Sequence, residues 1–192
     1  MPLLTEQEIT EQLRACFQKD RLSAFLRKLM TEDALPDALV NTPFFRFTGS
    51  PETLLGMAAA CDDAEVINWL CEKGADVNAR SSNAGTTALH RAALQHNTLA
   101  IKALLARGAD PTIEGGYKDV DGGVENTGKP SRWASALKGY GGDAETLLRK
   151  AEAAWERETA GHGGVGQRPP VAPTSLAPAD IADRKSGGKI GL

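Results

Sequence analysis

Aromatic residues are scarce in this chain and make up only 5% of its 192 residues. Ala and Leu dominate the apolar set instead. Strands of β-sandwiches and β-barrels favour aromatic and β-branched side chains, whereas small side chains allow helices to pack closely. The scarcity of aromatic residues therefore disfavours an all-β core and favours packed helices.

The chain also has few cysteines and only a small excess of one charge sign. The three cysteines, Cys16, Cys61 and Cys71, each lie within a helical apolar pattern. This odd number predicts reduced, buried thiols in a reducing compartment, with a redox or metal-binding thiol as the alternative. The formal net charge is -3 with both signs interspersed. Because no basic face is evident, nucleic acid is not an expected partner.

Long hydrophobic runs are missing as well. Met1–Thr10 has no basic stretch followed by an apolar one, so no signal peptide is expected. No segment approaches the roughly 18 to 20 apolar residues that a membrane helix needs. We therefore expect a cytoplasmic protein without membrane contact. A nuclear location or export without a cleaved signal remains an alternative.

Motifs for catalysis or metal binding do not appear in the sequence. It has no Cys-x-x-Cys pair, no His-Glu-x-x-His and no Gly-rich phosphate loop. The acidic stretch within Gly115–Lys129 fails the calcium-loop pattern, since the sixth and twelfth positions counted from Asp119 are Val124 and Pro130. This stretch is interpreted as a solvated loop, with a weak cation site or a partner contact as the alternative. No catalytic, cofactor-binding or metal-binding residue is predicted.

The N-terminal part of the sequence predicts two helices. Thr5 and Glu8 have the spacing of a capping box, in which each side chain accepts a backbone N–H of the other. The apolar residues that follow have the spacing of one helix face; they are Ile9, Leu13, Cys16 and Phe17. A second helix is expected after Asp20, and Pro36 should end it.

An aromatic cluster, Phe44-Phe45-Arg46-Phe47, follows these helices in an irregular segment. Burial of the rings under the helices is the favoured interpretation. Exposed rings that anchor a partner are the alternative, because exposed aromatic clusters tend to mark interfaces.

The centre of the chain contains an internal repeat. Thr53–Ala59 and Thr87–Ala93 match at an offset of 34 residues, which is 87 minus 53. Each copy continues into an amphipathic stretch and then closes with a similar segment, Gly74–Asn78 in one and Gly108–Thr112 in the other. Several features thus recur in the same order, as expected for stacked structural repeats.

Both copies resemble the ankyrin repeat, which has a period of about 33 residues and a Thr-Pro-Leu-His-x-Ala signature. The segment Thr87–Ala92 departs from this signature only at Ala88. The first copy departs from it at Leu54 and Gly56, and a weaker third copy begins at Pro130. The resemblance implies an all-α fold, a short ankyrin-type solenoid of stacked helix-turn-helix repeats. It also implies that His90 bonds backbone between adjacent repeats.

About three repeats are needed for a stable stack, so the flanking segments should supply additional layers. We expect a capping or degenerate repeat over 1–50 and two clear repeats over 51–113. An insertion loop over 114–129, a degenerate capping repeat over 130–158 and a disordered tail over 159–192 should follow. Asp37–Asn41 is similar to Gly74–Asn78, which supports counting the N-terminal helices as a repeat.

The resemblance implies a protein-protein interaction module that is not an enzyme, acting as an adaptor, scaffold or inhibitor. Such stacks bind a partner protein through a concave face and hairpin tips. The candidate protein-binding residues are Met57, Arg80, Asn83, Arg91, Gln95, His96, Tyr117, Lys118 and Trp133. The alternative function is an effector or enzyme with a small catalytic graft on the 115–128 insertion, centred on Asp119–Asn126 with His96 nearby.

The tail carries two further candidate motifs. Arg168–Pro173 contains a Pro-x-x-Pro spacing of the kind that SH3 domains bind as a polyproline II helix. Ile190–Leu192 ends the chain with an apolar residue, which is compatible with β-augmentation into the groove of a PDZ domain.

Overall fold

The computed structural model of the chain describes residues 5–15, 19–45, 51–80, 85–118, 124–136 and 142–160. The helices are α1 (Glu6–Ala15), α2 (Lys19–Thr31), α3 (Asp37–Val40), α4 (Leu54–Ala60), α5 (Ala64–Glu72), α6 (Ala88–Leu94), α7 (Thr98–Ala106), α8 (Pro130–Ala136) and α9 (Gly142–Ala160). The strands are β1 (Phe44–Phe45), β2 (Pro51–Glu52), β3 (Gly115–Lys118) and β4 (Val124–Gly128).

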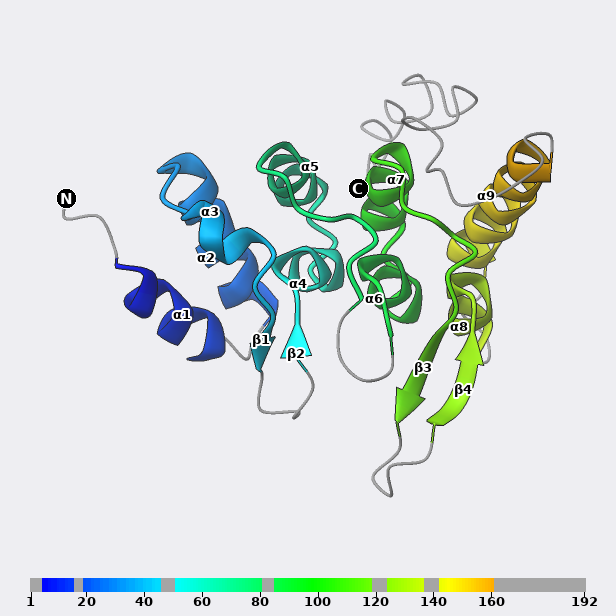
Figure 1. The fold of residues 1–192 in the computed structure, drawn as a ribbon, viewed down its shortest axis with the longest axis horizontal. Coiled ribbons are helices and arrows are strands. Elements are labelled where there is room, and N and C mark those ends of the chain that lie inside the picture. The colour runs from blue at the N-terminus through cyan, green and yellow to red at the C-terminus, as the bar shows by residue number, and fades with distance from the viewer. Residues whose placement is uncertain are drawn as a thin grey trace, which may run out of the picture.

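The helices form two rows, as Figure 1 shows. The inner row contains α4, α6 and α8, and the outer row contains α2, α5, α7 and α9. The strand pairs β1–β2 and β3–β4 extend from the inner row on the side away from the outer row. We call this side of the molecule the hairpin side. The stacked helix pairs are those of the predicted solenoid.

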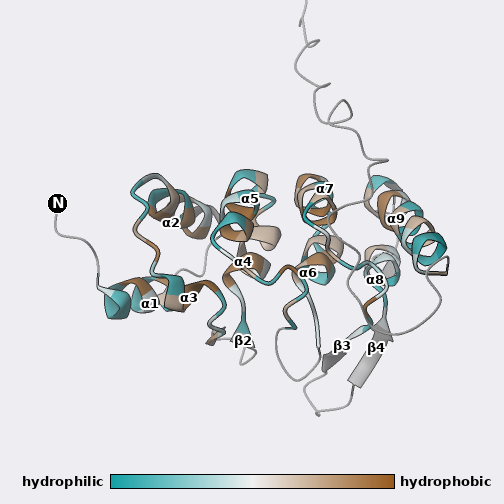
Figure 2. Ribbon diagram, turned by 45° about the horizontal axis from the view of Figure 1, so that its top comes forward, coloured by the Kyte–Doolittle hydropathy of each residue, from teal (hydrophilic) through white to brown (hydrophobic). Residues whose placement is uncertain are grey.

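Small side chains allow the inner helices to approach each other. The four alanines of the repeated motifs are fully buried where α4 packs against α6; they are Ala58, Ala59, Ala92 and Ala93. Leucines of both rows fill the remaining space, and one apolar cluster runs from Ile9 to Leu148. Figure 2 shows hydrophobic residues concentrated in α4, α6 and α7, at the middle of the stack. The burial of each layer therefore depends on its neighbours.

Side-chain caps and left-handed residues define the helix ends. Thr5 N–H donates to Glu8 Oε2 at 2.7 Å, and Glu8 N–H donates to Thr5 Oγ1 at 3.3 Å, which is the predicted capping box. At α4, Gly56 N–H donates to Thr53 Oγ1 at 3.1 Å. Gly74 and Gly108 follow the outer helices with φ of 88° and 83°, a backbone conformation that favours glycine.

Two asparagines connect successive layers in the same way. Asn41 Nδ2 donates to Gly74 O at 3.0 Å, and Asn41 Oδ1 accepts from Asp76 N–H at 2.9 Å. One layer further, Asn78 Nδ2 donates to Gly108 O at 3.4 Å, and Asn78 Oδ1 accepts from Asp110 N–H at 2.8 Å. Because the two arrangements match, the N-terminal helices join the next layer as one repeat joins another.

Several local features differ from the expectations. Pro36 does not end the second helix: α2 stops at Thr31, and Pro36 caps the short helix α3. The predicted insertion loop is an antiparallel strand pair in which Gly115 faces Gly128 and Tyr117 faces Glu125. A second pair, β1–β2, was not expected either, and its Phe44 is buried. The last helix continues to Ala160, just past the start of the predicted tail, and residues 161–192 lie outside the described part.

Candidate protein-binding surface

Arg91 lies on the hairpin side of the inner row. Its Nε is 2.7 Å from Oε1 of Glu52, which belongs to strand β2. The geometry is that of an ion pair rather than of an aligned hydrogen bond. The Glu52 side chain is only 3% exposed, whereas that of Arg91 is 31% exposed. A buried carboxylate therefore fixes a guanidinium whose other end reaches the surface.

Arg80 lies at the hairpin side as well. Its side chain is exposed, and its Nη1 donates to Glu114 O at 3.2 Å. Glu114 directly precedes β3, so this bond ties the end of the α5 repeat to the base of the β3–β4 hairpin. Arg132 is also exposed, and a Cβ on Gly128 of β4 would lie 2.7 Å from its Cδ. Arg132 therefore runs along the same hairpin.

His90 connects the start of α6 to the β3–β4 hairpin through its two ring nitrogens. Thr87 N–H donates to His90 Nδ1 at 3.2 Å, so Nδ1 is an acceptor and the ring proton is assigned to Nε2. Nε2 then donates to Gly128 O at 3.1 Å. Burial lowers the pKa of His90 to about 4, despite the opposing effect of the bond to Gly128. The imidazole is thus neutral near pH 7 and has the backbone-bonding role that the resemblance implies.

The hairpin base packs tightly on the His90 ring. A Cβ on Gly115 would lie 2.9 Å from His90 Nε2, a distance that real Cβ atoms essentially never show. On the other side, the Trp133 ring lies edge-on to His90 with the ring centroids 5.1 Å apart. These contacts fix the position of β3–β4 relative to α6 and α8.

Two of the candidate residues do not fit the prediction that they face a partner. Met57 is fully buried, and Trp133 is only 7% exposed. Both occupy the helix position that Arg91 occupies in α6. The reason is the nature of the side chain: an apolar group at this position is drawn into the core, whereas a guanidinium keeps its charged end in water.

Two other candidates lie about one helical turn beyond Arg91, toward the end of α6 that faces away from the hairpins. Gln95 is exposed at the C-terminal end of α6, and His96 is half-buried in the following turn with φ of 54°. The hairpins lie near the N-terminal end of α6, about 10 Å away for seven residues at 1.5 Å each. The structure therefore places Arg80 and Arg91 near the hairpins, and Gln95 and His96 about 6 Å or more beyond Arg91 along the helix.

The remaining candidates are described incompletely. Tyr117 and Lys118 lie in β3, but their side chains are outside the described part of the structure. Asn83 and Asp119–Gly123 lie outside it altogether. The proposed catalytic graft on the insertion thus falls largely on residues without a described geometry.

Sequence reasoning missed Glu52, the residue that positions Arg91. Its only sequence signal was the glycine at the histidine position of the first copy, Gly56. A Cβ on Gly56 would lie 3.2 Å from Cγ of Glu52 and 3.4 Å from its Oε1. The departure from the ankyrin signature therefore provides room for a buried carboxylate.

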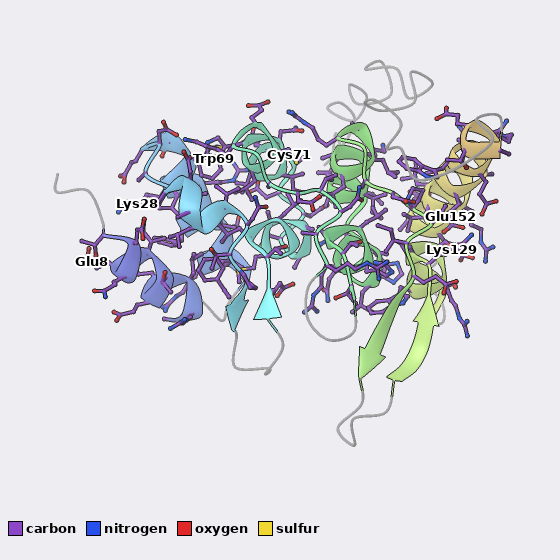
Figure 3. The ribbon with its side chains drawn as sticks, in the orientation of Figure 1. Glu8, Lys28, Trp69, Cys71, Lys129 and Glu152 are labelled. Atoms are coloured by element: carbon purple, nitrogen blue, oxygen red, sulfur yellow. The ribbon has the colours of Figure 1, made fainter. Side chains whose placement is uncertain are left out.

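The outer row differs from the hairpin side in its chemistry. Figure 3 labels Trp69 and Cys71 on α5, in the outer row and away from the hairpins. Cys71 is partly buried, and burial raises the pKa of its thiol. Within the described residues, no group of three or more His, Cys, Asp or Glu side chains is placed to hold a metal ion. None of the described helices has both the length and the apolar character required to cross a membrane.

A family profile of three consecutive ankyrin repeats matches residues 14–114, which is more than half of the chain. The chain therefore belongs to the ankyrin-repeat family. Ankyrin repeats are protein-interaction modules, and their fold is typically non-catalytic.

Curated relatives share this similarity over part of their length. The mitochondrial disaggregase of Bos taurus is 37% identical over 87 residues, or 45% of this chain and 13% of that protein. The SH3 and multiple ankyrin repeat domains protein 2 of Homo sapiens is 42% identical over 76 residues, or 39% of this chain and 4% of that protein. The potassium channel AKT3 of Oryza sativa subsp. japonica is 31% identical over 127 residues, or 66% of this chain and 12% of that protein. The chain thus spans a small part of each of these relatives.

Proposed function

We propose that the chain is an adaptor, scaffold or inhibitor that binds a partner protein through its hairpin side. The observation that carries this proposal is the location of three exposed or half-exposed arginines around the hairpins, Arg80, Arg91 and Arg132, of which Arg80 is bonded to Glu114 O and Arg91 is paired with Glu52. Arginine is over-represented among the residues that dominate binding energy, and a preorganised side chain loses less entropy on binding. We call these three residues the arginine cluster.

The outer row supports this choice by contrast, because two of its arginines, Arg27 and Arg107, bond side chains of a neighbouring layer. Arg27 donates to both carboxylate oxygens of Asp63, at 2.6 and 3.0 Å, and to Glu65 at 2.9 Å. Burial alone would raise the pKa of Asp63, but its hydrogen bonds from Arg27 and Ser23 outweigh that effect and hold the pKa below the ordinary value. Arg107 similarly donates to Asn68 at 2.8 Å and to Glu72 at 2.6 Å. These pairs join neighbouring layers and leave fewer donors for a partner.

Affinity capture with two matched surface variants tests the proposal. The hairpin-side variant carries Arg80→Ala and Arg132→Ala, and the outer-row variant carries Leu99→Ser and Ala106→Lys at exposed positions of α7. Proteins captured by the wild type should be lost with the first variant and retained with the second, while both keep the wild-type circular dichroism spectrum and Tm. Loss with the outer-row variant alone would place the partner on the other face and contradict the proposal.

A truncation after Ala160 tests the contribution of the tail. If an SH3 or PDZ domain binds the tail motifs, the truncated chain loses a set of partners that the hairpin-side variant retains. We further propose that the protein acts in the cytoplasm, which fluorescence microscopy of the tagged full chain would check.

A further inference from the structure

The ion pair between Glu52 and Arg91 joins two neighbouring repeats. Glu52 is one residue before the N-cap Thr53 of α4, and its carboxylate occupies the space beside Gly56. Arg91 comes from the equivalent inner helix of the next repeat. Separating a buried carboxylate from a guanidinium is strongly unfavourable, so this pair holds the Arg91 guanidinium in place.

The exposed end of Arg91 has donors that no group of the described residues uses. A guanidinium has five N–H groups in a planar fork, and in Arg91 the nitrogen that lies 2.7 Å from the Glu52 carboxylate is Nε. For the two terminal nitrogens, the described residues provide no hydrogen-bond acceptor. Two parallel N–H groups on a planar fork match the geometry of a carboxylate. The structure therefore presents an oriented, half-exposed donor pair to the solvent.

The electrostatic surroundings favour an anionic group at this point. Arg80 and Arg132 are exposed on the same side, Glu114 is exposed at the hairpin base, and Lys129 pairs with Glu156 at 2.7 Å. The whole chain has a formal net charge of -3. The charged hydrogen-bond donors on this side are its arginines, and an acidic segment is the partner chemistry that complements them.

We propose that Arg91 receives a carboxylate from an acidic segment of the partner protein and that Glu52 is the residue that positions Arg91 for this contact. This inference rests on the proposed function and adds the chemistry of the partner. A peptide segment fits better than a nucleic acid, because binding to a phosphate backbone requires many neutralising contacts and a net negative chain opposes it.

Fluorescence anisotropy with a labelled oligoglutamate peptide tests this proposal in the full chain. At low salt, about 50 mM, the wild type should bind oligoglutamate and should not bind oligolysine of the same length. Arg91→Ala should weaken oligoglutamate binding about tenfold, as expected for the loss of a charge-assisted hydrogen-bond pair. Arg107→Ala is the matched control, because Arg107 is 32% exposed and also pairs with a glutamate; it should change the affinity less than about twofold.

Glu52→Gln separates positioning from simple electrostatics. This change makes the protein less negative by one unit, so electrostatics alone would tighten the binding of a polyanion. If Glu52 positions Arg91, the affinity should instead fall about threefold, because the freed guanidinium must be ordered on binding. Tighter binding by Glu52→Gln would overturn the positioning role.

A double variant keeps the test decisive if Arg91→Ala alone prevents folding because it removes the positive charge beside the buried Glu52 carboxylate. Glu52→Gln combined with Arg91→Ala removes both charges, and it should fold and bind oligoglutamate about tenfold more weakly than the wild type. Wild-type affinity in the folded double variant would overturn the proposal. So would tighter, Arg91-dependent binding of a single-stranded oligonucleotide. If oligoglutamate fails to bind while partner capture still depends on Arg80 and Arg132, the acidic-partner inference falls and the proposed function stands.

Discussion

The two central repeats, α4–α5 and α6–α7, share a backbone and differ in what their side chains do. The turn between the two helices of each pair contains a non-glycine residue with positive φ, 58° at Asp62 and 54° at His96. Each outer helix ends in a left-handed glycine, Gly74 or Gly108. The scaffold is therefore the same in both repeats, and the differences between them report on local function.

The histidine position of the ankyrin signature shows the difference most clearly. In the second repeat His90 is fully buried and joins the helix start to the β3–β4 hairpin. In the first repeat Gly56 occupies this position and leaves room for Glu52, which holds Arg91. One position thus stabilises a hairpin in one repeat and orients a surface charge in the other. A departure from a repeat consensus can therefore indicate where a repeat positions a different side chain at its surface.

The largest expected effect is the loss of stability on His90→Ala. This change leaves Thr87 N–H and Gly128 O without a partner and opens a cavity beside Trp133. Each unsatisfied buried group costs about 1–3 kcal/mol, so the free energy of unfolding should fall by about 3–5 kcal/mol. Urea denaturation followed by circular dichroism measures this change. Gln95→Ala, at an exposed position that ends the same helix, is the control and should cost less than about 1 kcal/mol.

The pH dependence of stability should also distinguish the two repeats. The pKa of His90 falls from 6.5 to about 4 on folding, so the unfolded chain binds more protons between these values. The stability that His90 contributes is complete above pH 6.5 and declines as the pH falls toward 4, by about 3 kcal/mol in total. The difference between the wild-type and His90→Ala unfolding free energies, measured from pH 7 to pH 4, isolates this contribution. A constant difference across that range would show that His90 is not the titrating group.

The scaffold could be predicted from the sequence because its determinants are local and repeated. The helix-capping threonines, the buried alanines and the glycines after the outer helices recur at fixed spacing, and each has a physical reason at its own position. The backbone-bonding role of His90 followed from the match at Thr87–Ala92. These features depend on neighbours close in sequence or on the next repeat.

The surface could be predicted only in part, because exposure depends on contacts between layers. Met57, Arg91 and Trp133 occupy one repeat position, yet only Arg91 reaches the solvent. The β3–β4 pair has few alternating apolar residues, and it is held instead by the contact of its glycines with His90 and Arg132. Neither the exposure of Arg91 nor the β3–β4 pair can be predicted from the residues of its own segment.

The smallest expected effect concerns the two asparagines that join successive layers. Asn78 is half-buried and Asn41 is exposed, although both bond the closing segment of the next outer helix. The bond from Asn41 to Gly74 O is shorter, 3.0 Å against 3.4 Å at Asn78, so distance alone favours Asn41. Burial should decide which asparagine contributes more to stability, because water can replace the partners of an exposed group but not those of a buried one. Asn78→Ala should therefore lower the free energy of unfolding by about 1–2 kcal/mol and Asn41→Ala by about 0.5 kcal/mol, both measured by urea denaturation. The reverse order would mean that the N-terminal layer is joined to the stack more firmly than the two central repeats are to each other.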